Sequence, residues 1–228
     1  MMREVMYIDG KPLHEFRAKL LDWEVAPDLA NVISSGKNLF PALLKSEAGQ
    51  KKLSVTLNYQ TADRKWFPSP TKLIGQLNKT VNLQMPDGFI YRSALSSVSS
   101  VKYPAKWITE FTLEFKCVQC GQYQEIDIKQ NEQPIYYDGT APAPYKIEFT
   151  APTALQSVTV QGIQLTSIPA GAKIVLDGIE KKITQNGENK FLESNLIDFP
   201  VFESSEDSIP ITVSPFVPLK ISYYPIYI

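Results

Sequence analysis

The residues most able to carry chemistry are two cysteines, Cys117 and Cys120, in the motif C-V-Q-C. This spacing is half of a zinc knuckle, but a structural zinc needs four ligands and the chain has no second cysteine pair. A redox C-x-x-C motif would begin a helix, where the dipole lowers the thiol pKa, whereas this one ends a strand-like run. We expect two reduced cysteines in a strand or turn, with a metal shared between subunits or a regulatory disulfide as the alternatives.

Motifs for histidine-based or phosphate-binding catalysis are absent from the sequence. The single histidine, His14, has no clustered partners along the chain. No G-x-S-x-G, H-E-x-x-H, G-x-x-x-x-G-K-[ST] or G-x-G-x-x-G motif occurs. We expect His14 on the surface or in a turn, and we expect no catalytic residue, no cofactor and no resident metal.

Glu110 and Glu114 alternate with apolar residues, so they share the polar side of a predicted strand over residues 107–118. A retaining glycosidase holds two carboxyl groups about 5–5.5 Å apart, and an inverting one holds them further apart. Four residues of strand span about 13 Å, which fits neither geometry. We therefore interpret this side as a solvated or interface surface.

Aromatic residues beside prolines form the remaining candidate site. They stand in two loop-like segments, W-F-P and Y-P-A-K-W, and are Trp66, Phe67, Tyr103 and Trp107. Exposed aromatic side chains on such loops can stack on sugars or anchor a protein partner. The alternative is that they fill the ends of a β-sandwich.

The elements that would position these residues are mostly strands. Alternating polarity predicts strands over residues 53–59 and 107–118, and Asp87-Gly88 and Asp177-Gly178 predict tight hairpins. Residues 16–20 fit either a strand or a helix face. Later strands are expected over residues 145–150, 156–165, 172–176, 179–185, 209–213 and 219–224.

One helix is predicted over about residues 70–80. Ser69 can cap it, and Pro70 fits the first helical position, where a missing N–H costs nothing. The apolar residues that recur at helical spacing form one stripe, which comprises Leu73, Ile74, Leu77 and Val81.

Composition narrows the classes of function. The chain has 228 residues, of which 43 % are hydrophobic, and a net charge of -1. Such a balance gives no means of gripping nucleic acid through its phosphates or an anionic membrane. The apolar runs are far shorter than the about 20 residues of a spanning helix, and the N-terminus has no stretch of signal-peptide length. We expect no membrane or sequence-specific nucleic-acid partner, and folding in a cytoplasm.

A proline-rich segment predicts the domain boundary. Residues 134–144 hold three prolines and one glycine, a composition typical of a stiff linker. We expect a mainly β protein with two β-sandwich domains, at residues 1–134 and 145–228, joined by a linker at 135–144. The helix belongs to the first domain.

In their order along the chain, these parts resemble the distal tail proteins (Dit family) of long, non-contractile-tailed bacteriophages, or siphophages. The first domain resembles the family's ring-forming domain in strand 53–59, the helix after Ser69-Pro70, the Asp87-Gly88 hairpin and the closing strand 111–117. The second resembles the family's galectin-like sandwich in residues 171–178, 186–189, 199–200 and 219–225. Two family patterns are replaced here, by residues 118–123 and 203–208.

The resemblance implies a structural protein of the virion tail tip, assembled in the bacterial host cytoplasm, and not an enzyme. Six copies would form a ring, the baseplate hub, which joins the tail tube protein to tail-associated and receptor-binding proteins. A closed ring needs one patch that meets a different patch on the next copy. Glu110 and Glu114 would then face the channel and repel passing DNA, and the four aromatic residues would serve at interfaces.

Two other functions are weighed against this one. A galectin-like sandwich is compatible with a carbohydrate-binding module, although all three tryptophans lie in the first part of the chain. A cell-wall glycoside hydrolase is the third interpretation, and the missing catalytic motifs weigh against it.

Overall fold

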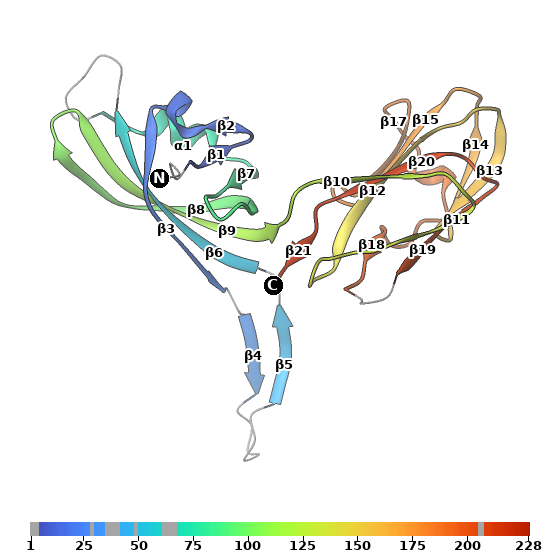
Figure 1. Cartoon of the computed structure of the whole chain (residues 1–228), viewed down its shortest axis with the longest axis horizontal. Coiled ribbons are helices and arrows are strands. Elements are labelled where there is room, and N and C mark those ends of the chain that lie inside the picture. Colours follow the sequence, from blue (N-terminus) through green and yellow to red (C-terminus); the bar gives the residue numbers. More distant parts are fainter. Residues whose placement is uncertain (1–4, 28–29, 35–41, 48–49, 61–67, 205–207) are drawn as a thin grey trace. The chain divides into compact units, whose positions relative to one another are not determined.

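The computed structural model describes residues 5–27, 30–34, 42–47, 50–60, 68–204 and 208–228 (Figure 1). Its contacts divide the chain into two compact units. The first unit extends to Gly121 and also includes Tyr227 and Ile228, and the second covers Gln122–Ile226. The expected mainly β fold is confirmed, with α1 as the one α-helix among the described residues. None of these residues belongs to a helix with the length and apolarity needed to cross a membrane.

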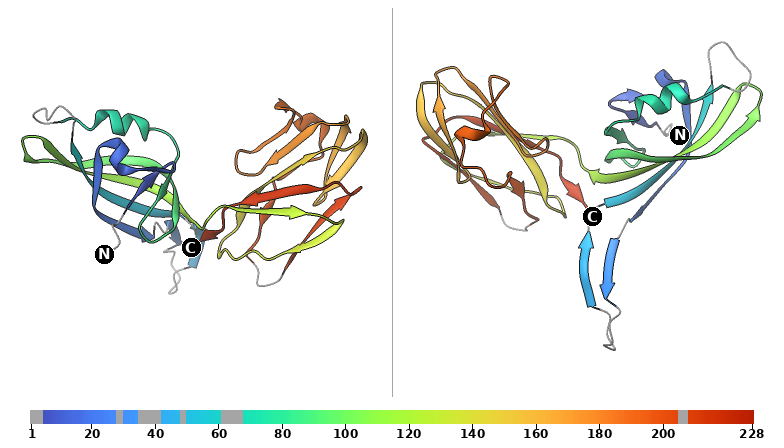
Figure 2. Two further views of the ribbon diagram at one scale, coloured as in Figure 1. Left: turned by 45° about the horizontal axis from the view of Figure 1, so that its top comes forward. Right: turned by 180° about the vertical axis from the view of Figure 1, so that it is seen from behind.

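The first unit is built on one curled, eight-stranded sheet that wraps around its core (Figure 2). The strand order is β2-β1-β7-β8-β9-β6-β3, and β21 pairs with β9 beside this path. The bounds are β1 Tyr7–Ile8, β2 Lys11–Pro12, β3 Ala18–Pro27, β6 Gln50–Gln60, β7 Val81–Gln84, β8 Ile90–Ala105, β9 Ile108–Cys120 and β21 Ile226–Tyr227. A separate two-stranded sheet pairs β4 (Ala30–Ser34) with β5 (Ala42–Glu47).

Strands β6 and β9 supply much of the core of the first unit. Their inward residues alternate with polar ones, and Leu53, Val55, Leu113 and Phe115 are all 0 % exposed. This confirms the predicted strand over residues 53–59 and, with bounds of 108–120, the one predicted over 107–118. Beside them, the ring of Phe89 meets that of Tyr227 edge to face, with centroids 5.5 Å apart.

The helix α1 (Thr71–Gln76) is shorter than the predicted range of 70–80. Pro70 is the N-cap rather than the first helical residue, and it makes no side-chain cap hydrogen bond, so the predicted Ser69 cap was wrong. The Ser69 hydroxyl accepts a hydrogen bond from the Thr71 backbone amide at 3.4 Å. Leu73 and Leu77 are buried as the apolar stripe predicted. The predicted end of the helix was wrong, because Val81, the last residue of the apolar stripe, is buried as the first residue of β7.

Residues 13–20 combine both of the structures that their pattern allowed. Leu13–Phe16 form a 3₁₀ helix, η1, and β3 begins at Ala18. Arg17 separates them with a left-handed φ of 58°. Strand β3 is an edge of the sheet, and its register shifts between Leu20 and Asp22. A bulge of this kind discourages a further strand from adding to the edge.

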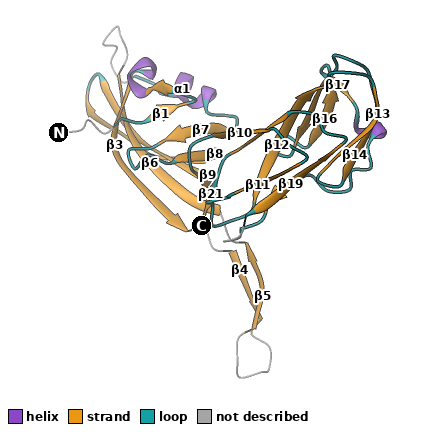
Figure 3. Ribbon diagram, turned by 45° about the vertical axis from the view of Figure 1, so that its right-hand side comes forward, coloured by secondary structure: helices purple, strands orange, loops and turns teal. Residues whose placement is uncertain are grey.

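The second unit is a sandwich of two antiparallel sheets (Figure 3). The larger has the order β10-β20-β12-β15-β16-β17, with β18 paired to β12, and the smaller has the order β11-β19-β13-β14. The bounds are β10 Gln124–Ile128, β11 Glu132–Ile135, β12 Ala143–Thr150, β13 Leu155–Val160, β14 Ile163–Ile168, β15 Lys173–Asp177, β16 Lys182–Gln185, β17 Glu188–Asn189, 3₁₀ helix η2 Phe191–Glu193, β18 Val201–Phe202, β19 Ile209–Ser214 and β20 Leu219–Tyr223.

The proline-rich segment is part of the second unit in this structure. Before it, β10 pairs with β20, and β11, which extends into it as far as Ile135, pairs with β19. Within it, Ile135, Tyr137 and Ala143 are buried in the core of the sandwich, and the Tyr137 hydroxyl donates to the carbonyl of Ala141 at 2.5 Å. The contacts therefore divide the chain after Gly121 rather than at the expected linker, because the apolar residues between the prolines are buried.

Two predicted strands of the second unit have different bounds. Residues 156–165 form the hairpin of β13 and β14, which turns at Gln161 and Gly162 with φ angles of 49° and 76°. The predicted strand over 179–185 begins only at Lys182, since the turn after Asp177 is longer than two residues. A side chain at Gly178 would meet the Tyr145 carbonyl at 2.6 Å, so this turn requires glycine.

Candidate interaction surfaces

The outer face of the first sheet carries both carboxylates that were expected there. Strand pairing sets Glu114 opposite Ser54 and Glu110 opposite Asn58, all of them partly exposed polar residues. Next to them, the hydroxyls of Thr56 and Thr112 lie 3.0 Å apart across the same two strands. The two carboxylates therefore share one polar face, as strand alternation predicted.

Glu114 is held by two partners on this face. Its carboxylate accepts a hydrogen bond from the Ser97 hydroxyl at 2.9 Å and pairs with the Lys52 ammonium at 3.2 Å. The Ser97 hydrogen bond, followed by the hydrogen bond and charge of Lys52, lowers the pKa of Glu114. The group is thus fixed as a carboxylate at neutral pH.

Acidic and basic side chains are mixed on this outer face, where the exposed Arg92 of β8 lies opposite Val118. Strand β3 adds Asp22 and Glu24, which lie opposite polar residues of β6. The lysines in register with polar positions of the same face are Lys19, Lys52, Lys102 and Lys116. The face is therefore mixed in charge rather than strongly acidic.

Two of the four predicted interface aromatics lie at the far end of the β8–β9 hairpin. Tyr103 is 50 % exposed and Trp107 is 48 % exposed, beside Val101 at 48 %. Neither of these two aromatic side chains is therefore buried in a core. Trp66 and Phe67 lie outside the described residues.

The two cysteines are buried and unbonded to each other. The Cys117 thiol donates to the Lys51 carbonyl at 3.3 Å, and the Cys120 thiol to the Val118 carbonyl at 3.7 Å. Desolvation raises the pKa of Cys117 to about 12 and that of Cys120 to about 11. Neither thiol is therefore activated as a nucleophile.

In the described ranges, no three or more His, Cys, Asp or Glu side chains come together in a way that could hold a metal ion. His14 is exposed in η1. The structure thus leaves His14 on the surface, where the sequence placed it.

A cleft between η1 and α1 was not anticipated from the sequence. Its volume is about 320 Å³, and three cations line it, Lys11, Arg17 and Lys72, with Glu15 as the acidic residue. In the described part of the chain none of these cations makes an ion pair. We call this the cationic cleft, and its other lining residues include Phe16, Tyr59 and Gln76.

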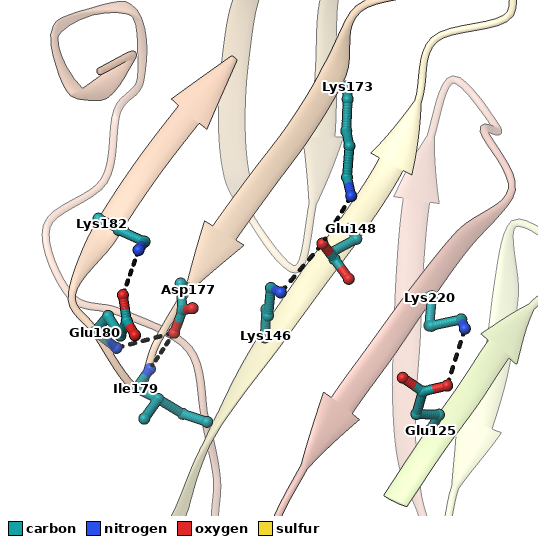
Figure 4. Close-up of polar contacts among 9 residues, drawn as sticks. All are labelled: Glu125, Lys146, Glu148, Lys173, Asp177, Ile179, Glu180, Lys182 and Lys220. Atoms are coloured by element: carbon teal, nitrogen blue, oxygen red, sulfur yellow. Dashed lines mark hydrogen bonds and ion pairs between the residues drawn. The ribbon is translucent and has the colours of Figure 1, made fainter. Parts of the chain in front are cut away.

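The outer face of the larger sheet of the second unit is a ladder of ion pairs (Figure 4). The Glu148 carboxylate lies 3.1 Å from Lys146 and 3.3 Å from Lys173, and Lys220 lies 2.9 Å from Glu125. Burial alone would raise the pKa of Glu148, but the hydrogen bonds and charges of the two lysines outweigh it and lower the pKa. These charges are satisfied within the chain.

The second unit also has one exposed apolar segment that the sequence alone did not predict. Residues 191–197, here called the apolar loop, include Leu192 at 95 % exposure, Ile197 at 92 % and Phe191 at 44 %. The sequence signal was weak, because these residues follow the Asn186-Gly187 turn without strand or helix periodicity.

Comparison with known proteins gives a fold but no sequence family. No family model and no curated protein matches the chain. Among solved structures, the crystal structure of phage SPP1 Dit, described as a paradigm of the hub adsorption apparatus in phages that infect Gram-positive bacteria, matches with a TM-score of 0.67 at 12 % identity. The match covers 99 % of each chain.

A second solved structure agrees with the first. A chain of the phage P2 baseplate, in its activated conformation with calcium, matches with a TM-score of 0.60 at 11 % identity over 97 % of this chain and 98 % of that one. The same baseplate with strontium gives the same score and identity, over 96 % and 97 %. The chain therefore shares its fold with these proteins through both units.

Proposed function

We propose that this chain is a structural hub protein of a phage tail tip, which joins the tail tube to tail-associated and receptor-binding proteins. The observation that carries the proposal is the agreement in fold with a phage hub protein over nearly the full length of both chains. Agreement through two units is more informative than one shared sandwich, because single sandwiches occur in many unrelated proteins.

In this proposal the chain acts through interfaces and not as an enzyme. Six copies form a closed ring, in which one patch of each copy meets a different patch of the next. The exposed hairpin end at Tyr103 and Trp107 is one surface suited to such a contact. The bulged edge strand β3 disfavours open-ended strand addition. Assembly would take place in the host cytoplasm, before the ring is built into the virion tail.

The polar outer face of the first sheet would line the channel of the ring. Glu110 and Glu114 would then offset the lysines of that face, so that DNA phosphates pass without sticking. This role depends on the balance of charge and not on an excess of carboxylates.

The proposal is tested on two levels. Electron microscopy of the purified protein, alone and mixed with a phage tail tube protein, should show sixfold rings. Mass spectrometry of purified virions should detect the chain in the tail. Absence of the chain from intact tails, or turnover of a cell-wall glycan by the purified protein, would reject the hub role.

Carbohydrate binding by the second unit is the second candidate, and one observation favours it. Tyr123, which is 42 % exposed, stacks at a tilt on Tyr224 with ring centroids 4.8 Å apart. Nearby on β20, the Ser222 hydroxyl is buried without a hydrogen-bond partner among the described residues. Binding on a glycan array that is lost with Tyr123→Ala would establish this activity, and no binding at millimolar oligosaccharide would reject it.

A further inference from the structure

We propose that copies of this chain contact one another head to tail, with the apolar loop of one copy seated in the cationic cleft of the next. The inference rests on the proposed ring and deepens it by naming one contact between copies. The loop belongs to the second unit and the cleft to the first, so the two patches are different and the contact is heterologous.

The apolar loop presents hydrophobic surface that the chain itself leaves in water. Leu192 and Ile197 are almost completely exposed, whereas Leu196 between them is only 8 % exposed and packs into the core. Burial of large aliphatic side chains is the main favourable term in most protein association. Two such side chains on one short segment are therefore suited to a docking contact.

The loop is also held in place, which lowers the entropic cost of docking. Lys190 is buried, and its ammonium donates to the Ser167 carbonyl at 3.1 Å and to the Glu193 carboxylate at 2.5 Å. Asn195 makes two hydrogen bonds to the backbone of Gln164 in β14. Its backbone N–H donates to the backbone carbonyl of Gln164 at 3.1 Å, and its side-chain oxygen accepts from the backbone N–H of Gln164 at 2.6 Å. The exposed side chains thus project from a fixed backbone.

The cationic cleft has the size and lining to receive them. Its volume of about 320 Å³ corresponds to roughly ten water molecules, which is enough for a branched aliphatic side chain. Phe16 and Tyr59 give it apolar surface, and a neighbouring cavity of about 500 Å³ shares Phe16 and Gln76 with it. The docked loop would replace water on these groups.

Charge complementarity favours a second copy as the occupant. Glu188 and Asp198 flank the loop, are exposed, and make no ion pair within the described residues. The one lysine of the loop's base, Lys190, is turned inward. Among the described residues, the three cations of the cleft make no ion pair and outnumber its one carboxylate, Glu15. The two carboxylates beside the loop complement this excess, and the nearby Lys181 lies over the Phe199 ring at 5.2 Å from its centroid. The same carboxylates disfavour an anionic membrane as the partner of the loop.

The test uses two single-cysteine additions in the full-length protein. Leu192→Cys places a thiol on the loop, and Gln76→Cys places one in the cleft. The native Cys117 and Cys120 are buried, so we expect them to form no disulfide under mild oxidation at neutral pH. In an equimolar mixture of the two variants we expect a disulfide-linked dimer, with a yield at least tenfold higher than the yield from either variant alone.

A matched control and a charge exchange complete the test. Tyr136→Cys, at a site that is 76 % exposed in the same unit, should give only background with the cleft variant. Lys11→Glu with Lys72→Glu in the cleft copy should lower the yield about tenfold, and Glu188→Lys with Asp198→Lys in the loop copy should restore it.

Three results would overturn the inference: no dimer above background in the mixture, equal dimer from Leu192→Cys alone, or a yield indifferent to the charge exchange. Rings seen by electron microscopy together with any of these would leave the hub function standing and reject only this contact. Absence of the chain from virion tails would instead reject the hub function.

Discussion

Lys52 and Glu114 form an ion pair across β6 and β9, with the ammonium nitrogen 3.2 Å from a carboxylate oxygen. The hydrogen bond from the Ser97 hydroxyl, followed by the hydrogen bond and charge of this lysine, holds the pKa of Glu114 below its usual value of 4.5. A carboxyl group whose pKa is lower in the folded state stabilises the fold above its unfolded-state pKa, and this stabilisation is lost as the pH falls through the folded-state pKa.

The pH dependence of stability should therefore change when Glu114 is replaced. We expect Glu114→Gln to lower the urea midpoint slightly at pH 7, and this difference from the wild type to disappear as the pH falls below 4.5. Urea titrations at pH 7 and pH 3 measure it. Glu110→Gln on the same face is the control, and a difference that grows at low pH would contradict the assignment.

Two glycines should respond in opposite directions to the same substitution. Gly178→Ala would bring a Cβ to 2.6 Å from the Tyr145 carbonyl oxygen and 2.8 Å from that of Pro200, so the backbone must shift. We expect a loss of about 1–3 kcal/mol in the free energy of unfolding. Gly75→Ala in α1 meets no atom within 4 Å and should add up to about 1 kcal/mol. Denaturant titration of both variants decides, and equal effects would show that the turn is not tightly packed.

The cysteines should be chemically inert in the folded protein. With thiol pKa values of about 12 and about 11, the fraction of thiolate at pH 8 is about one in a thousand or less. We expect a disulfide reagent to modify fewer than one thiol per chain over hours, and both thiols within minutes in denaturant. Rapid modification of the native protein at pH 8 would contradict the burial of these residues.

DNA passage should depend on the carboxylates if the polar face lines a channel. The outer face of the first sheet carries four carboxylates and four lysines, and Glu110→Lys with Glu114→Lys would leave it with two carboxylates and six lysines. We expect virions with this variant to assemble tails but to deliver DNA less efficiently, on the order of tenfold, because phosphates would bind the face.

The control for that experiment keeps the change in net charge but moves it elsewhere. Glu132→Lys with Glu203→Lys alters two exposed residues of the second unit and should leave delivery unchanged. Unchanged DNA delivery and ring assembly in the Glu110 and Glu114 variant would reject the channel-lining role.

Local patterns predicted the core of the fold but not the ends of its elements. Alternation over β6 and β9 was sufficient because Leu53 and Phe115 must be buried and their neighbours must not. The helix was predicted too long because Val81 fits the helical stripe yet is the first residue of a strand. Tertiary pairing, which the periodicity does not contain, decided between the two.

The domain boundary shows a second limit of sequence patterns. Prolines made residues 135–144 look like a linker, but Ile135 and Tyr137 between them are buried. Composition averages over such a segment, whereas burial depends on single positions.

The candidate surfaces divide in the same way. The shared polar face of Glu110 and Glu114 follows from the period of a strand, and the sequence predicted it. The cationic cleft brings Lys11 and Lys72 together from segments far apart in the chain, and no local pattern could show that. Exposure of Leu192 depends on which side of its loop faces the core, which only the folded chain determines.

The return of Tyr227 and Ile228 to the first unit makes the second unit an insert, bounded by two junctions rather than one. Removing everything after Gly121 would also strip the Tyr227 ring from Phe89. A clean excision must therefore join Gly121 to Tyr227 through a linker. The same two junctions would allow a different domain to replace the second unit while the sequence of the first unit stays unchanged.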